Sequence, residues 1–191
     1  MEDKNSVYPY AYSYKGKCGY LLWEANGDGD VFKQHQDKLI LSVGDFEEAK
    51  KVFAGLPFVI RWDEAAIIDF DVFWKILSGL GSGSIIDETA CEVMLNGWNF
   101  IEDLIRTFAL DALREKLHEP QLNKVYEKFF YGCNIAAVTP SGCGYTPLWQ
   151  PPEVLMLRER LVDVWDEQAA CGSYPEQVIV RRRGYGNRNT Y

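Results

Sequence analysis

Side chains able to perform acid–base chemistry are few in this sequence. Histidine, the commonest general base, occurs only at His35 and His118. His35 is expected at the end of a strand. His118 is expected at the C-terminal end of a helix, where a cation is favourable for structural reasons alone. We therefore predict that neither histidine is catalytic.

The five cysteines are scattered along the chain and include no Cys-x-x-Cys pair. Cys133 and Cys143 flank a segment rich in glycine and proline, where a thiol nucleophile would need a nearby base. Their spacing from the histidines matches no zinc site, and buried thiols are ordinary components of protein cores. The sequence therefore predicts no catalytic residue, no metal and no cofactor. A small enzyme that uses a cysteine of this segment stays open as an alternative.

Acidic residues interleaved with aromatic ones form the second pattern of interest. From Asp63 to Asp103 the chain has nine acidic residues and one lysine, a net charge of −8, equal to that of the whole chain. Carboxylates speed association with basic proteins and disfavour nucleic acid, and aromatic side chains are common interface anchors. The pattern predicts a protein-binding surface. Its expected contact residues are Trp62, Asp63, Glu64, Asp69, Asp71, Glu102, Asp103 and Trp149.

The cellular location follows from the termini and the cysteines. The N-terminus is polar and acidic and lacks the basic and apolar regions of a signal peptide. The uncharged stretch at residues 135–152 is interrupted by prolines and glycines, which predicts turns and excludes a membrane span. An odd number of scattered cysteines indicates a reducing compartment. We therefore expect a cytoplasmic protein without a membrane segment.

Strand patterns dominate the first part of the chain. Residues 8–14 alternate aromatic and small side chains, which is typical of an edge strand or an ordered arm. Residues 19–24 and 31–35 flank an Asn-Gly turn, the strongest local hairpin signal. A third strand is expected at residues 38–43. This region predicts a small antiparallel sheet.

Helical patterns dominate the remainder. Asp45, followed three residues later by Glu48, has the form of a capping box, and Asp69 is expected to cap a second helix. The longest apolar stripe runs from Asp87 to about Leu117 and contains Gly97, which a close helix approach would explain. The other expected elements are a buried strand at 58–60, helices from Pro120 and Pro151, and short strands at 135–138 and 178–180.

The order of these elements indicates the fold class. Strands that precede helices favour an α+β fold, with a small, mostly antiparallel N-terminal sheet packed against a bundle of four to five helices. A chain of 191 residues suits one domain. We expect residues 1–180 to form a single globular domain. Residues 181–191, which contain four arginines, are expected to form a basic, flexible tail.

Several segments resemble those of a poorly characterised group of bacterial proteins. They are IIDFDVFW at 67–74, LNGWNFIEDL at 95–104, AAVTP at 136–140 and YTPLW at 145–149. Small acidic proteins of this kind resemble the immunity proteins of contact-dependent growth inhibition and related polymorphic toxin systems. The resemblance implies a non-enzymatic, cytoplasmic toxin inhibitor. It would bind one cognate toxin domain, usually a nuclease, very tightly and cover its active site.

Three interpretations of function follow from the sequence. The first is an immunity protein whose partner is a toxin domain with a basic surface, without binding to nucleic acid or membranes. Its basic tail is not what mimicry of a nucleic acid requires. The second is a small cytoplasmic enzyme with a cysteine-containing loop. The third is a homodimeric structural or interaction protein.

Overall fold

The computed structural model describes residues 6–25, 29–81 and 83–170, apart from the side chains of Glu64 and of residues 167–170. In this part of the chain a mixed sheet near the N-terminus lies beside a group of helices, so the predicted α+β class is confirmed. The strand expected at 178–180 and the basic tail at 181–191 lie outside the described residues.

Strand β1 is the centre of the main sheet. β1 pairs antiparallel with β2 on one side and parallel with β7 and β8 on the other, while the far edge of β2 pairs with β3 and β6. The prediction of an edge strand or arm at residues 8–14 is therefore wrong. The main sheet consists of β1 (Ser6–Tyr14), β2 (Lys17–Glu24), β3 (Val31–Phe32), β6 (Leu41–Val43), β7 (Val59–Ile60) and β8 (Ala66–Asp69), and β4 (Gln34–His35) and β5 (Lys38–Leu39) form a separate two-stranded sheet.

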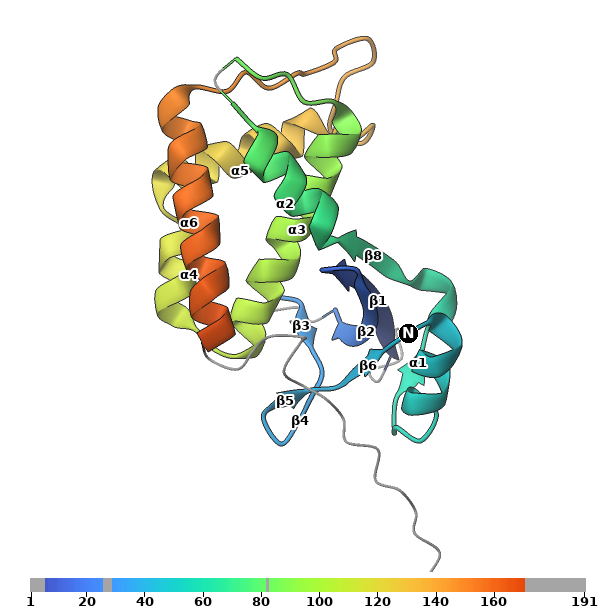
Figure 1. Ribbon diagram of the computed structural model, residues 1–191. Helices are drawn as coiled ribbons and strands as arrows, with labels where there is room; N and C mark the ends of the chain where they lie inside the picture. The colour runs from blue at the N-terminus through green and yellow to red at the C-terminus, as the bar shows by residue number, and fades with distance from the viewer. Residues whose placement is uncertain (1–5, 26–28, 82, 171–191) are drawn as a thin grey trace, which may run out of the picture.

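The helices occupy both faces of the main sheet. They are α1 (Phe46–Phe53), α2 (Phe70–Gly79), α3 (Glu88–Thr107), α4 (Asp111–Leu117), α5 (Pro120–Gly132) and α6 (Pro151–Ala170), with a 3-10 turn, η1, at Trp62–Glu64. Figure 1 shows α2–α6 grouped together, with α1 apart from them beside the sheet. Among the described residues, no helix combines the length and apolar character needed to cross a membrane.

Alternation along β1 explains why this strand is central. Successive side chains of a strand point to opposite faces. Val7 packs with α1 residues in one apolar cluster, whereas Tyr10 and Tyr12 belong to the larger core shared with α2–α6. On β2, Leu22 and Leu21 divide in the same way. Both faces of the sheet are thus covered, which an edge arm would not require.

The caps expected at Asp45 and Asp69 are present, and the structure adds a third at Asp87. The Asp45 carboxylate accepts a hydrogen bond from the backbone N–H of Glu48 at 2.9 Å, and Asp69 accepts from the first turn of α2. Asp87 accepts from the N–H of Ala90 at 2.8 Å. Each carboxylate satisfies donors that the helix itself leaves unpaired. These three acids of the sequence therefore have a local structural role.

Two expected elements differ in the structure. The helix predicted from Asp87 to about Leu117 is divided into α3 and α4, because Ala109 takes a left-handed conformation with φ of 52°. The strand predicted at residues 135–138 is wrong. In its place the backbone turns, with the N–H groups of Val138 and Thr139 both donating to the Ile135 carbonyl.

Gly97 marks the close approach predicted within the long helix. A Cβ atom at this position would lie 2.5 Å from Cε2 of Phe73 in α2, too close for any real contact. Phe73 is itself fully buried and makes edge contact with Phe70 at 5.8 Å between ring centroids. The absence of a side chain at Gly97 is therefore what allows α2 and α3 to pack.

We predict that Gly97→Ala lowers the free energy of unfolding by about 1–3 kcal/mol, because the added methyl group overpacks a core with no room for it. Gly79→Ala is the matched control, since a Cβ at the end of α2 would meet nothing within 4 Å. Urea unfolding of both variants measures the difference. Equal stability of the two would contradict the packing argument.

Candidate functional site

Trp149 was expected as a surface anchor, and this prediction is wrong. The side chain is only 1% exposed and packs against Phe129, with 4.8 Å between ring centroids. The ammonium of Lys128 lies 5.5 Å from the Trp149 ring centroid. Trp149 therefore belongs to the core, where it supports the segment that connects α5 and α6.

Trp62 and Asp63 lie in η1, at the sheet side of the molecule. The Trp62 ring is half-buried against Phe46 and Phe53 of α1, at centroid distances of 5.2 and 6.2 Å. Asp63 is exposed, and the side chain of Glu64 lies outside the described part of the structure. Of this predicted group, Asp63 is thus available as a surface charge, and Trp62 has mainly a packing role.

Asp69 and Asp71 are used within the fold. Asp69 caps α2, as described above. The Asp71 carboxylate accepts hydrogen bonds from the N–H groups of Lys15 and Gly16, at 2.8 and 3.0 Å, in the turn between β1 and β2. Both side chains remain exposed on one side, but their positions are fixed by these backbone donors.

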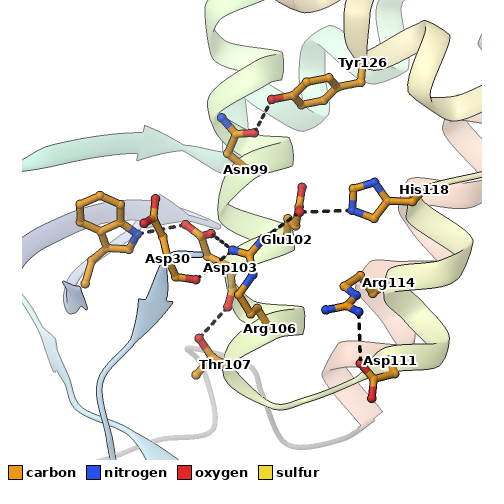
Figure 2. Close-up of polar contacts among 11 residues, drawn as sticks. Asp30, Asn99, Glu102, Asp103, Arg106, Thr107, Asp111, Arg114, His118 and Tyr126 are labelled. Atoms are coloured by element: carbon orange, nitrogen blue, oxygen red, sulfur yellow. Dashed lines mark hydrogen bonds and ion pairs between the residues drawn. The ribbon is translucent and has the colours of Figure 1, made fainter. Parts of the chain in front are cut away.

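Glu102 and Asp103 are the two predicted residues that the structure brings into one network (Figure 2). Asp103 accepts hydrogen bonds from the Trp23 indole at 3.0 Å and from Arg106 at 3.1 Å. Arg106 also donates to the backbone carbonyl of Asp30 and to Glu102, both at 3.0 Å. The network therefore joins β2 and the residue before β3 to α3.

The network continues beyond the salt bridges. Glu102 also contacts His118 at the end of α4, with 3.2 Å between Oε1 and Nε2. The hydroxyl of Thr107 donates to the Asp103 carbonyl at 2.6 Å and accepts from the N–H of Phe32 in β3 at 2.8 Å. The prediction that Asp103 is a surface charge is therefore wrong. Its side chain is only 8% exposed and is held by partners inside the protein.

Burial has a strong effect on this carboxyl group. Desolvation raises the pKa of Asp103 to about 7, and the negative charges of Asp30 and Glu102 act in the same direction. The hydrogen bond from Trp23 and the positive charge of Arg106 oppose the shift. A carboxyl group with such a raised pKa is typical of functional sites. Here, however, one Asp103 oxygen is bonded to Trp23 and the other to Arg106, which indicates a structural role.

A second candidate site is an exposed apolar surface between α5 and α6. We define the 131–148 surface as Tyr131, Ile135, Val138, Tyr145 and Leu148, whose exposed fractions range from 39% to 62%. It borders a shallow hollow of about 360 Å³. The hollow is lined by Tyr131, Val138, Thr139, Pro140, Cys143, Gly144 and Tyr145.

Specific contacts hold this surface in place. The Asn134 side chain donates to the Tyr145 carbonyl at 3.2 Å and accepts from the Tyr145 N–H at 2.7 Å. The rings of Tyr131 and Tyr145 meet edge to face, 6.2 Å apart. Lys128 donates to the carbonyl of Leu148 at 2.8 Å. The apolar side chains are therefore displayed on an ordered loop.

The first turns of α3 lie against the same loop. A Cβ at Gly132 would overlap Sγ of Cys91 and lie 3.3 Å from Cδ of Pro147, so α3, α5 and the loop meet there. Burial raises the pKa of the Cys133 thiol, and the negative charges of Glu92 and Glu88 add to the increase. Both glutamates are exposed. Two exposed acids thus flank Cys91, at the point where α3 meets this loop.

The cysteines that motivated an enzyme interpretation occupy different environments. Cys133 is buried and donates to the Phe129 carbonyl at 3.2 Å. Cys143 is exposed in the hollow, whose lining residues contain neither histidine nor carboxylate. His118 pairs with Glu102, and His35 lies in β4. Within the described residues Cys143 therefore has no histidine or carboxylate base beside it, and no group of three potential ligands is placed to hold a metal ion.

The residues of the 131–148 surface were missed in the sequence. The sequence feature that could have identified them is the uncharged stretch at residues 135–152. It was interpreted only as evidence against a membrane span. A long irregular segment inside a compact domain is itself unusual and commonly functional. Sequence pattern could have identified the segment, but not which of its aromatic residues are buried.

We predict that Asp103→Asn reduces the pH dependence of stability. With a raised pKa, folded Asp103 keeps its proton up to about pH 7, whereas the ordinary pKa of an aspartate carboxyl in the unfolded chain is 3.8. The native state then binds more protons in this window, so the free energy of unfolding falls as pH rises from about 4 to about 7. The variant lacks this contribution, which is about 4 kcal/mol.

Denaturant unfolding at several pH values checks this prediction. The exposed residue Asp163 supplies the control Asp163→Asn, which removes a carboxylate from α6 outside the network. A wild-type slope retained in Asp103→Asn would mean that other groups cause the pH dependence.

Comparison with protein-family models, with curated proteins and with solved structures finds no match to this chain. Interpretation of its function therefore rests on the two sites described above. These are the internal network around Asp103 and the exposed 131–148 surface.

Proposed function

We propose that this protein is a cytoplasmic immunity protein, which binds and neutralises a cognate toxin domain by covering its active site. The observation that carries the proposal is the 131–148 surface, a group of apolar and aromatic side chains displayed on an ordered loop. The resemblance of four sequence segments to immunity proteins supplies the kind of partner. The proposal concerns binding and assigns no catalytic residue.

The physical basis is the cost of exposing apolar surface. Single exposed apolar residues are ordinary, but contiguous groups commonly mark interaction sites. Two of the five residues are tyrosines, whose rigid rings supply contact area at low entropic cost. Because Asn134 already fixes Tyr145, binding would lose little further conformational freedom.

The acidic character of the chain supports the same proposal in a different way. A net charge of −8 produces a negative field that attracts a basic protein over distances longer than direct contact. Several acids expected at the interface are used inside the fold. In this proposal the exposed acids therefore speed association, and the apolar surface supplies the stable contact.

The test uses the toxin domain that this proposal expects to be encoded next to this gene. We expect the full chain to bind that domain and to restore growth of cells that produce it. The double variant Tyr131→Ala/Tyr145→Ala should bind roughly 30-fold more weakly or worse, since truncation of a buried aromatic anchor costs about 2 kcal/mol or more. Isothermal titration calorimetry measures the affinity.

A matched pair of leucines controls for loss of apolar surface in general. Leu148 belongs to the 131–148 surface and is 62% exposed, while Leu155 on α6 is 59% exposed. We expect Leu148→Ser to weaken binding and Leu155→Ser to leave it unchanged, with unaltered melting temperatures. Failure of the wild-type chain to bind or neutralise the toxin would refute the immunity function.

A further inference from the structure

We infer that the 131–148 surface accepts a partner segment in which an apolar side chain is flanked by lysine or arginine. The inference rests on the proposed protein-binding function and adds the chemistry of the segment. The apolar side chain would occupy the hollow beside Tyr131 and Tyr145. Its basic neighbours would pair with Glu88 and Glu92.

The lining of the hollow indicates which kind of partner side chain would fit inside it. Its lining is formed by aromatic, aliphatic, proline and glycine residues together with Thr139 and Cys143. The lining contains no Asp, Glu, Lys, Arg or His side chain. A charged side chain placed there would lose hydration without a partner, whereas an apolar one gains from burial. The hollow therefore fits an aromatic or branched aliphatic side chain.

Two acidic residues of α3 indicate which charge the flanking residues of the partner would carry. Glu88 and Glu92 lie four residues apart on α3, which places them on one helix face. They flank Cys91, the α3 residue whose side chain meets Gly132 at the end of α5, beside Pro147 of the loop. Both side chains are exposed and lie in the first two turns of the helix. They are thus available to a cation that approaches along the loop.

Among the described residues of α5, the cation closest in sequence to the loop is already paired. Lys128 is the basic residue of α5 nearest the loop, and its ammonium is held by Glu153 at 2.6 Å and by the Leu148 carbonyl. Lys128 is therefore already paired with an acid in the first turn of α6. The charge presented beside the hollow is negative, and it favours a basic partner.

A second copy of this chain fits the surface poorly. In a two-fold contact the same patch meets itself, so Glu88 and Glu92 of both copies would border one interface. Like charges placed together across an interface oppose association. The net charge of −8 on each copy adds to the repulsion. The structure thus favours a different, basic protein over a homodimer.

The experiment selects phage-displayed random peptides on the full-length chain. The counter-selection uses Tyr131→Ala/Tyr145→Ala. We expect the enriched peptides to combine an aromatic or branched aliphatic residue with an adjacent lysine or arginine. Synthetic copies of these peptides are then measured by fluorescence anisotropy against Glu88→Lys/Glu92→Lys. Affinity should fall about tenfold or more, and its decrease with added salt should become weaker.

The matched control moves the same charge change to another surface. Glu115 on α4 and Asp163 on α6 are both exposed, and Glu115→Lys/Asp163→Lys alters the net charge by the same amount. This variant should bind the peptides much as wild type does. Circular dichroism melting of all three variants separates loss of binding from loss of folding.

Three outcomes would overturn the inference. They are absence of enrichment over the counter-selection, enrichment of peptides without basic residues, and equal loss of affinity in the control variant. A dimer in sedimentation equilibrium that dissociates in Tyr131→Ala/Tyr145→Ala would replace it with a self-association surface. The toxin-binding assay tests the proposed immunity function separately from the peptide experiment. Toxin binding unaffected by changes in the surface would leave the immunity function intact and refute this location.

Discussion

The packing of α3 between the sheet and the other helices is the constraint on which this fold depends. α3 contacts β3 and β8 on one side and α2, α4 and α5 on others. Ten of its twenty residues are buried. Phe100 lies at the centre of this contact, with ring centroids of Tyr10, Phe32 and Phe70 between 4.8 and 5.1 Å away. A helix enclosed to this extent leaves little freedom to the elements around it.

The two ends of α3 have different surroundings and different roles. Near its C-terminus the helix makes hydrogen bonds to β2, to β3 and to the residue before β3. They come from the side chains of Asp103, Arg106 and Thr107. The ion pair is only partly solvated, so its net contribution to stability is small or negative. Its better-supported role is to define how α3 lies on the sheet, since a shifted helix would leave a buried charge unpaired. Near its N-terminus the helix instead presents free carboxylates beside an apolar loop.

Local signals in the sequence were enough to predict much of the fold. The caps at Asp45 and Asp69 depend on a few neighbouring residues, and a close helix contact explained Gly97 inside an apolar stripe. The central position of β1 could not be predicted, because it depends on β7 and β8, which come some 50 residues later in the chain. The break at Ala109 was missed because alanine favours helix, and surrounding contacts impose its left-handed conformation.

The candidate site was harder to predict, for a related physical reason. A cluster of acids along the sequence does not imply a cluster on the surface. Asp69, Asp71, Asp87 and Asp103 are each used to satisfy donors at a helix start, a turn or the interior. Tryptophan is equally ambiguous, since Trp149 and Trp98 are both buried at 1% exposure. Whether such side chains serve the core or the surface depends on long-range packing.

This division of the acids changes how the net charge should be interpreted. A carboxylate held by backbone donors still contributes to the long-range field, because a hydrogen bond satisfies the group without removing its charge. It cannot easily reorient to meet a cation on a partner, however. Steering can therefore come from the whole negative segment, while direct pairing falls to the few acids without internal bonds. Glu88 and Glu92 are exposed, and they flank Cys91 where α3 meets the loop that presents these apolar side chains. Charge and apolar area thus coincide near the start of α3.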